Sequence, residues 1–242
     1  MSYRGGSFNL KLTSRLEKIA SLVTEGKKIA DVGTDHGYIP VYLLKKEIIP
    51  FAVLSDVNKG PLDNGKKLVM KNNLLEKVDF KLGSGIDVLE KDEVDEVIIA
   101  GMGGMLIADI LENKKSVSHH LQKLILQPMQ AQSSLRQYLL ENGYKIIDEV
   151  LVREDFRIYE VIVAKYTGKN TEVKDDIYYE VGEQLVQNKN PLLKDFVEKK
   201  IKAYTDVLVH LKDIDSESIE KKKIEIKAKI AKLDEIIKTI EE

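Results

Sequence analysis

The sequence predicts an α/β fold with a mostly parallel sheet and a helical tail, and three observations support this fold class. Short aliphatic runs alternate with amphipathic stretches over the first two thirds of the chain, which is typical of a parallel sheet covered by helices. Glycine-rich turns follow several of these runs. After Gly168 the aliphatic runs stop, and lysine and glutamate dominate to the end of the chain.

The expected elements follow in order along the chain. A helix is expected over residues 12–23, whose apolar residues fall on one helical face, and another over 61–72. Seven strands are expected, at 28–32, 51–57, 78–82, 96–100, 123–126, 145–152 and 157–166. Because only a few residues separate the last two strands, we expect them to pair as an antiparallel hairpin that closes an otherwise parallel sheet.

Residues 169–242 are expected to form a helical coiled-coil tail on an α/β domain of residues 1–168. Isoleucine and leucine recur at heptad a and d positions, a short coiled-coil signature. These positions are Ile219, Ile226, Ile230, Leu233, Ile237 and Ile240. An apolar stripe from 193 to 211 predicts a preceding helix, with a turn at 213–218. The favoured interpretation is an antiparallel hairpin; dimerisation, or support for a large substrate, stays open.

Composition excludes several functions. The chain has no cysteine, which rules out disulfides, thiolate zinc sites and a cysteine nucleophile, and which fits a cytoplasmic protein. No run approaches the roughly 20 apolar residues that cross a bilayer, so no membrane partner is expected. No group of histidines and acids has metal-ligand spacing, and none is expected to bind a metal. The net charge of −2 argues against a uniformly basic surface.

A cofactor loop is predicted directly after the first strand, in the segment Asp-Val-Gly-Thr-Asp-His-Gly from 31 to 37. Glycine in a strand-to-helix turn lets a ligand approach the backbone. Three further strand ends carry similar turns, and the carboxyl edge of such a sheet is where ligands bind. The predicted cofactor-binding residues are Asp31, Gly33, Thr34, Gly37, Asp56, Val57, Gly83, Ser84, Gly85, Gly101, Met102 and Gly103.

The charges of this loop indicate which cofactor it binds. Dinucleotide loops prefer the pattern G-x-G-x-x-G, which is absent here. Asp31 and Asp35 would repel a pyrophosphate, whereas an acid suits the amino group of a methionine moiety. Asp56 lies 23 residues after Gly33, a spacing that suits a carboxylate on ribose hydroxyls. S-Adenosylmethionine is therefore favoured, and a dehydrogenase is the least favoured interpretation.

Several stretches together carry a family resemblance. They are Leu12-Thr-Ser-Arg15-Leu16, Ala30 to Pro40, Ser55 to Leu62, Ile99 to Gly104, Leu126-Gln127-Pro128 with Leu135-Arg136, and Tyr159-Glu160. From Leu10 to about Gly168, and in its helical tail, the chain resembles the bacterial tRNA (adenine-N1)-methyltransferases of the TrmK type. The resemblance implies a Rossmann-like class I methyltransferase that uses S-adenosylmethionine and modifies the adenosine at position 22, in the D-loop region of tRNA.

Two positions depart from the family pattern. Ser84 stands where the family often has an aspartate that could hydrogen-bond the adenine amine, and Met129 stands where asparagine is common. The serine hydroxyl, or a backbone group, could replace the first contact. A side-chain contact from position 129 to the base is not expected.

The chemistry of N1 methylation fits the residues present. Ring N1 of adenine holds a free lone pair, whereas N6 methylation usually requires an Asp/Asn-Pro-Pro-aromatic turn, and none follows the fourth strand. Methylated N1 is cationic, so a nearby anion should stabilise the product. Asp35 is the leading catalytic candidate, followed by His36 and Gln127. A cofactor contact for Asp35 and a supporting role for His36 are equally open; His119 and His120 are expected to have no chemical role.

Candidate RNA contacts gather near the N-terminus and the later strands. They are Arg4, Lys11, Arg15, Lys18, Arg136, Arg153 and Tyr159. Each cation alone is equally consistent with a solvated surface charge, and a hairpin tyrosine is more often part of the core. Two other functions stay open: methyl transfer to a small molecule or a protein, and a non-catalytic nucleotide- or partner-binding module. A monomer, or a weak homodimer through the tail, is expected.

Overall fold

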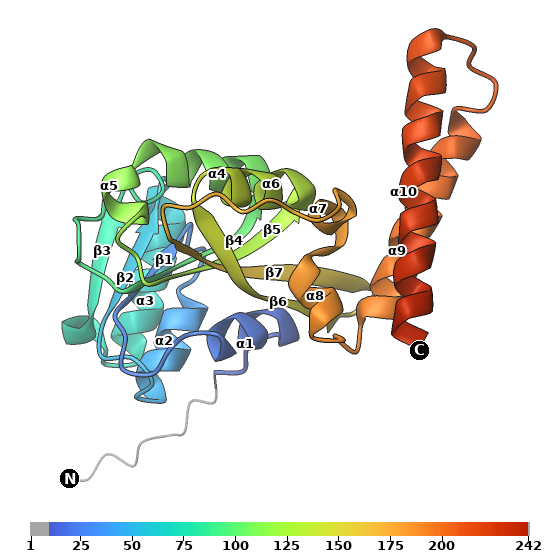
Figure 1. Ribbon diagram of the computed structural model, residues 1–242. Coiled ribbons are helices and arrows are strands. Elements are labelled where there is room, and N and C mark those ends of the chain that lie inside the picture. The colour runs from blue at the N-terminus through green and yellow to red at the C-terminus, as the bar shows by residue number, and fades with distance from the viewer. Residues whose placement is uncertain (1–9, 242) are drawn as a thin grey trace, which may run out of the picture.

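The computed structural model of the protein describes residues 10–241 (Figure 1). One seven-stranded sheet with the order β3-β2-β1-β4-β5-β7-β6 forms the centre of the main body. The strands are β1 (Ile29–Val32), β2 (Ala52–Asp56), β3 (Val78–Leu82), β4 (Glu96–Gly103), β5 (Lys123–Gln130), β6 (Tyr144–Glu154) and β7 (Arg157–Tyr166). β1 to β5 pair in parallel, and β7 pairs antiparallel with both β5 and β6. The predicted fold class and the predicted hairpin are confirmed.

Helices cover both faces of the sheet (Figure 1). They are α1 (Ser14–Ser21), α2 (Tyr38–Lys45), α3 (Lys59–Lys71), the 3-10 turn η1 (Leu75–Lys77), α4 (Gly104–Asn113), α5 (Lys115–Ser118) and α6 (Gln132–Glu141). Residues of α1 to α3 share a core with one face, and residues of α4 to α6 share a second core with the other. All four residues of β1 are buried, because a parallel strand packs against helices on both sides.

Two strands continue at least three residues past their predicted ends. β4 continues to Gly103 rather than ending at 100, and β5 continues to Gln130 rather than ending at 126. The register between them shifts at Ala100/Met102 and again at Met102/Gly103. Bulges of this kind bend a strand locally. Here they place the glycine turn of β4 beyond the edge of the sheet, and β4 still pairs with β5 as far as Gly103 and Gln130.

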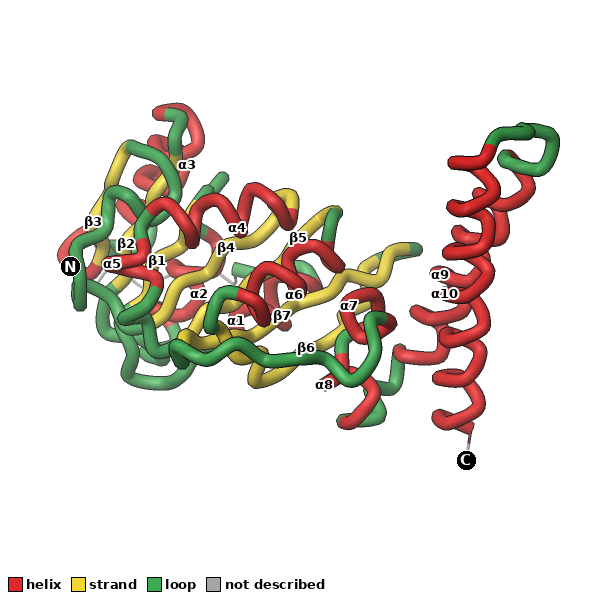
Figure 2. Tube along the Cα trace, turned by 45° about the horizontal axis from the view of Figure 1, so that its top comes forward, coloured by secondary structure: helices red, strands yellow, loops and turns green. Residues whose placement is uncertain are grey.

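The tail is a pair of antiparallel helices that stands beside the main body (Figures 1 and 2). α7 (Ile177–Val181) and α8 (Glu183–Gln187) lead into α9 (Leu193–His210), and α10 (Glu217–Glu241) returns along α9. Ile226, Leu233 and Ile236 are the buried residues of α10. Ile236 lies outside the predicted heptad seam and is buried because α10 also packs against α7. Leu151 of β6 joins this third core, which anchors the tail on the sheet.

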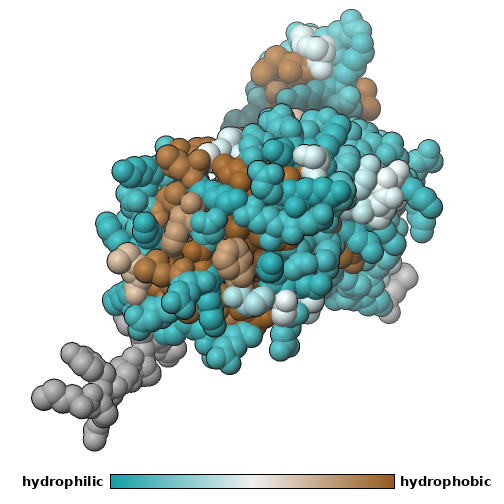
Figure 3. All heavy atoms as spheres, turned by 90° about the vertical axis from the view of Figure 1, so that its left-hand side faces the viewer, coloured by the Kyte–Doolittle hydropathy of each residue, from teal (hydrophilic) through white to brown (hydrophobic). Residues whose placement is uncertain are grey.

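The surface that faces away from the tail carries an apolar region (Figure 3). Exposed apolar side chains near the β3 edge of the sheet include Val57, Met70, Leu75 and Leu82. Val57 and Leu82 lie at the carboxyl ends of neighbouring strands, so part of this region adjoins the edge where the glycine turns meet. Among the helices that the structure describes, none is long and apolar enough to cross a membrane.

Candidate functional site

A cavity of about 320 Å³ opens at the carboxyl edge of the sheet, between β1 and β4. Its walls come from α1, the β1–α2 turn, the start of α2 and the end of β4. The lining residues are Arg15, Leu16, Asp31, Gly33, Thr34, Asp35, His36, Gly37, Tyr38, Ile39, Ala100 and Gly101. The fold thus brings six predicted residues of the first loop and one of the fourth strand end together around a single space.

The β1–α2 turn is held by its backbone. The N–H groups of Gly33 and Thr34 both donate to the carbonyl oxygen of Ser55, at 2.8 and 3.1 Å. The N–H of Gly37 donates to Thr34 Oγ1 at 3.0 Å. Gly33 has φ +75°, and a Cβ there would overlap the methyl group of Met102. Glycine is therefore favoured at position 33 for its conformation, and a larger residue would also have to displace the end of the Met102 side chain.

Asp31 is a buried acid without a cationic partner among the ion pairs of the described residues. It is the third of the four residues of β1 and is 8% exposed. Burial raises its pKa to about 6; a hydrogen bond with Thr34 opposes the rise, and the negative charge of Asp56 adds to it. A carboxylate held in this way is stabilised by a ligand cation. The cavity wall is consequently suited to an ammonium group.

The second and third strand ends adjoin this cavity. Asp56 ends β2, and its Oδ1 accepts a hydrogen bond from the N–H of Asn58 at 2.7 Å. The N–H of Gly83 donates to the Asp56 carbonyl oxygen at 2.9 Å, which fixes the two loops to each other. Ser84 is exposed beside them, and Gly85 (φ +52°) packs closely on Ile110. A ribose and a purine ring can follow this edge from the cavity.

The carboxyl end of β4 contacts the carboxyl end of β1 through the side chain of Met102. This residue is half-buried, and its side chain covers Gly33. Gly101 has φ +79° with open space where a Cβ would stand, while Gly103 precedes α4 in an extended conformation. Gly101 also lines the cavity.

Asp35 and His36 contact each other at the cavity mouth. Asp35 Oδ2 lies 2.9 Å from His36 Nδ1, and the Asp35 side chain is 77% exposed. The His36 ring stacks on Tyr38, with centroids 5.0 Å apart and planes 3° apart. This contact fixes the imidazole, which in turn orients the carboxylate. The acid remains open to a substrate that enters from solvent.

The structure contradicts the prediction that Gln127 is a catalytic residue, since Gln127 is not among the residues that line the cavity. Its side chain is fully buried at the end of β5. Oε1 accepts from Arg15 Nη1 at 2.7 Å, and Nε2 donates to the Pro128 carbonyl oxygen at 3.0 Å. The amide has no free surface for a base edge. It fixes the position of Arg15 instead.

Arg15 belongs to the cavity wall, although the sequence suggested an RNA contact. Its backbone N–H donates to Glu154 Oε2 at 2.9 Å, and its guanidinium lies 5.3 Å from the centre of the Tyr159 ring. Its Nε is buried and has no hydrogen-bond partner among residues 10–241. Such a donor requires an acceptor from a ligand or from water. The neighbouring cavity is where one can bind.

The prediction that Arg136 contacts RNA is wrong, because the side chain is only 1% exposed. It forms a buried cluster with Glu149 at 2.7 Å and Glu160 at 2.6 Å, and it also donates to the Tyr179 carbonyl oxygen at 3.1 Å. No phosphate can reach it. Its role is structural, since it joins α6 to β6, β7 and α7.

The other residues predicted to contact RNA lie on different elements. Lys11 is exposed and Lys18 half-buried on the N-terminal segment. Arg153 is exposed and pairs with Asp195 of α9. Tyr159 is half-buried beneath Arg15, and Arg4 lies outside the described residues. RNA binding by these residues stays a prediction.

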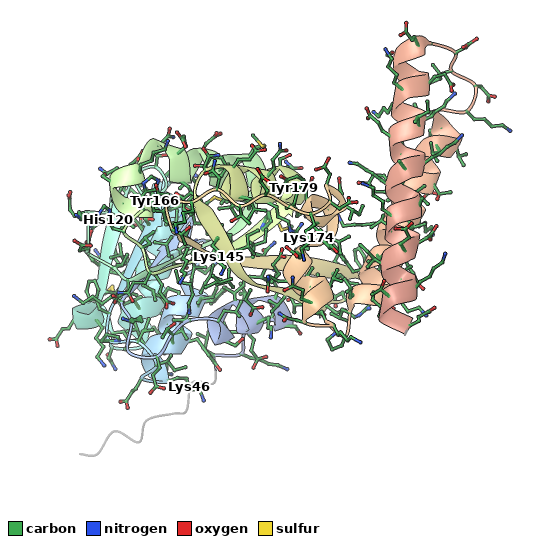
Figure 4. The ribbon with its side chains drawn as sticks, viewed as in Figure 1. Lys46, His120, Lys145, Tyr166, Lys174 and Tyr179 are labelled. Carbon is green, nitrogen blue, oxygen red and sulfur yellow. The ribbon has the colours of Figure 1, made fainter. Side chains whose placement is uncertain are left out.

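Histidines outside the cavity take part in packing. The His119 ring stacks on Tyr166, with centroids 3.6 Å apart and planes 3° apart. Burial lowers the pKa of His119, and the charge of Lys115 adds to this effect. Figure 4 shows Tyr166 and His120 at the end of the body away from the tail. Among the described residues, no group of three or more histidine or acidic side chains is placed to hold a metal ion.

A second cavity, of about 530 Å³, was missed by sequence reasoning. It lies between the tip of the β6–β7 hairpin and α9, and its walls include Phe156, Arg157, Lys199 and Lys200. Only Tyr159 of its lining was predicted to have a function. The available signal was an aromatic residue between two charged ones, in Asp155-Phe156-Arg157, at the turn of a hairpin.

Comparisons with known proteins agree over nearly the whole chain. A family profile described as TrmK, tRNA (adenine(22)-N(1))-methyltransferase, matches residues 29–235. The tRNA (adenine(22)-N(1))-methyltransferase of Bacillus subtilis (strain 168) is 33% identical over 240 residues, which cover 94% of this chain and 98% of that protein.

Solved structures show the same similarity. The crystal structure of the B. subtilis m1A22 tRNA methyltransferase TrmK matches with a TM-score of 0.86 and 31% identity, covering 95% of this chain and 100% of that chain. A putative tRNA (m1A22) methyltransferase of Streptococcus pneumoniae, in complex with S-adenosyl-L-methionine, matches with a TM-score of 0.83 and 28% identity over 94% and 100%. TrmK of M. capricolum, in complex with S-adenosylhomocysteine, matches with 0.79 and 29% over 95% and 99%.

Proposed function

Because the chain belongs to the TrmK family of tRNA (adenine(22)-N(1))-methyltransferases, we propose that the cavity between β1 and β4 holds the methionine part of its cofactor. The enzyme transfers a methyl group from S-adenosylmethionine to N1 of an adenosine in tRNA. The observation that carries the site assignment is Asp31, a buried acid that lacks a cation and lies against a glycine turn. An ammonium group there would pair with it.

Arg15 supports the same orientation of the cofactor. Its buried Nε lacks an acceptor, and it lines the cavity together with Asp31. A methionine moiety presents an ammonium and a carboxylate on one carbon, so an acid and a partnerless guanidinium nitrogen in one cavity match both groups. We propose that Asp31 binds the ammonium and Arg15 the carboxylate, which replaces the RNA contact predicted for Arg15.

The nucleoside part follows the neighbouring strand ends. Asp56 would accept both ribose hydroxyls, and the linked loop of Gly83, Ser84 and Gly85 would lie along the edge of the adenine ring. Val57 is 60% exposed and Leu82 57% exposed at the two strand ends. Apolar side chains so exposed would gain from covering a purine face. Thr34, Gly37, Met102 and Gly103 would shape the rest of the site through their backbone contacts.

The chemistry places few demands on the protein. When bound, S-adenosylmethionine supplies an electrophilic methyl group, which N1 takes with its lone pair in line while the carbon–sulfur bond breaks and its electron pair stays on sulfur. The product base carries a positive charge. Asp35, exposed at the cavity mouth, would stabilise that charge, and His36 would hold the carboxylate in place. Both residues would act by position and charge.

The tRNA contacts, the two domains and the oligomeric state are part of the same proposal. Lys11, Lys18, Arg153 and Tyr159 would contact tRNA around the entrance of the site. Residues 1–168 would form the catalytic domain and 169–242 the tail domain. The chain would act as a monomer or as a weak homodimer through the tail.

Methyl transfer to tRNA transcripts tests the function. Labelled S-adenosylmethionine, an unmodified transcript and nucleoside analysis should give 1-methyladenosine. A transcript with guanosine in place of adenosine at position 22 is the matched control and should take no label. Label on both transcripts would contradict the position, and label on neither, with cofactor binding intact, would contradict the substrate.

A further inference from the structure

We infer that the groove between the β6–β7 hairpin tip and α9 binds an unpaired RNA nucleotide next to the target adenosine. The inference rests on the proposed function, since it names a second contact for the same substrate. The groove has a volume of about 530 Å³, within the range of small-molecule pockets. It is therefore large enough for one nucleotide.

Both parts of the molecule build this groove. The hairpin extends from the sheet toward the tail (Figure 1), and Lys199 of α9 donates through Nζ to the Phe156 carbonyl oxygen at 2.7 Å. Arg153 of β6 pairs with Asp195 of α9 beside it. These contacts fix the width of the groove. The tail thus has a role at the catalytic end of the protein.

The groove continues the cofactor cavity. Tyr159 and Pro128 line the groove, while Arg15, whose guanidinium covers the Tyr159 ring, lines the cavity. The two spaces therefore share one wall. An RNA strand that places a base at the mouth of the cavity would bring a neighbouring nucleotide within reach of the groove.

An exposed aromatic ring is placed to stack on that nucleotide. Phe156 is 76% exposed at the hairpin tip, and the guanidinium of Arg157 lies 5.4 Å from the centre of its ring. No core requires this ring. Bases in RNA loops are bound by stacking on aromatic and guanidinium planes, and Phe156 with Arg157 offers both.

The accessible charge of the groove has one sign. Arg157, Lys199 and Lys200 line it. The acid of its lining, Glu160, is 4% exposed and bound to Arg136. Arg157 and Lys199 surround an open aromatic ring together with Lys200, which also pairs with Glu180 at 3.8 Å. These cations complement a phosphodiester with an unstacked base. A protein segment in this groove would need acidic residues to match the cations. It also lacks the base that makes stacking on an exposed ring favourable.

Substitution of Phe156 tests the stacking contact. Phe156→Ala should raise the KM for tRNA roughly tenfold, because the loss of one base–aromatic stack weakens binding by about that factor. Phe156→Tyr, which keeps the ring, should restore the wild-type KM. The Kd for S-adenosylmethionine, measured by calorimetry, should stay unchanged in both. An unchanged KM in Phe156→Ala would overturn the proposal while wild-type methylation still supported the enzyme function.

A fluorescent base reports the same contact independently of turnover. 2-Aminopurine would be placed singly at each nucleotide flanking position 22 of a transcript. Stacking on Phe156 should change its fluorescence at one of the two positions with the wild-type protein, and this change should be lost with Phe156→Ala. Equal signals from both proteins at both positions would contradict a nucleotide in the groove.

The cations are tested by salt dependence. Arg157→Gln should reduce the slope of log affinity for tRNA against log salt concentration by about 1, the value expected for one lost phosphate contact. Lys202→Gln, an exposed lysine of the same tail helix outside the groove lining, is the matched control and should leave the slope unchanged. Equal slopes for Arg157→Gln and wild type would contradict the proposed contact between Arg157 and an RNA phosphate in the groove.

Discussion

The guanidinium of Arg15 donates from Nη1 to the side-chain oxygen of Gln127 over 2.7 Å, although 112 positions separate the two residues. This bond joins the start of α1 to the end of β5. It closes the cofactor cavity on one side with a helix that precedes the sheet in the chain. The Arg15 nitrogens therefore have a position that the loop motifs alone do not determine.

Gln127→Ala should weaken both stability and cofactor binding. The variant leaves a buried guanidinium nitrogen without an acceptor, at a cost of about 1–3 kcal/mol in the free energy of unfolding. Urea unfolding would measure that change, and calorimetry the Kd for S-adenosylmethionine, which should rise because Arg15 loses its orientation. Gln127→Glu keeps an acceptor for Arg15 and should retain more of the cofactor affinity. Equal effects of the two substitutions would contradict this role.

Cofactor affinity should depend on pH through Asp31, whose pKa burial raises to about 6. The charged carboxylate binds the ammonium group, so the affinity for S-adenosylmethionine should be constant above pH 6 and fall about tenfold per pH unit below it. Titration calorimetry between pH 5 and 8 measures this. Asp31→Asn should abolish the pH dependence and bind weakly at every pH. A pH profile unchanged by Asp31→Asn would assign the dependence to another group.

The same carboxylate should destabilise the cofactor-free protein. Its folded pKa, about 6, lies above the ordinary value of 3.8, so the folded state holds more protons than the unfolded state between these values. Stability therefore falls as the pH rises through this window, by on the order of 3 kcal/mol in total. Asp31→Asn should unfold at higher urea concentration than wild type at pH 7.5 and show no such gain at pH 4. A less stable variant at both pH values would contradict this.

Much of the architecture was predictable, because it depends on local patterns. The runs that form β1 to β5 alternate with helical stretches, and parallel strands buried on both faces appear in a sequence as continuous aliphatic segments. The glycine turns were predictable for the same reason. Gln127 and Arg136 were misassigned, and the partners of Arg15 were missed, because a charged or polar residue type does not reveal long-range partners. The side-chain hydrogen bonds between Arg15 and Gln127, Arg136 and Glu149, and Arg136 and Glu160 span 13 to 112 positions.

Gly33→Ala and Gly101→Ala should differ in effect, although both glycines have positive φ, +75° and +79°. A Cβ at position 33 would overlap the Met102 methyl, whereas one at position 101 meets nothing within 4 Å. Both variants should lose about 1 kcal/mol to backbone strain. Only Gly33→Ala should also displace Met102 and raise the Kd for S-adenosylmethionine more than tenfold in the fully folded protein. Equal Kd values for the two variants would show that backbone strain alone determines the loss of cofactor affinity.

Arg136→Met should destabilise the fold rather than weaken RNA binding. It leaves Glu149 and Glu160 as buried charges without a cation, which costs about 3–5 kcal/mol. Burial raises the pKa of Glu149, with Arg136 opposing the rise, so the variant should take up a proton on folding. Urea unfolding would measure the loss. Normal stability together with a raised KM for tRNA would instead support the RNA contact that the sequence predicts for Arg136.

Asp35→Asn separates catalysis from cofactor binding. The amide keeps the size of the carboxylate but removes its charge, so the cationic product loses its stabilisation and kcat should fall about 100-fold, as for other transition-state charge contacts. Single-turnover methylation of tRNA measures the step, and calorimetry should give an unchanged Kd for S-adenosylmethionine. His36→Asn should lower kcat less, because Asp35 keeps its charge and loses only the 2.9 Å contact that orients it. If Asp35 instead binds the cofactor, Asp35→Asn will raise the Kd and leave kcat at saturation intact.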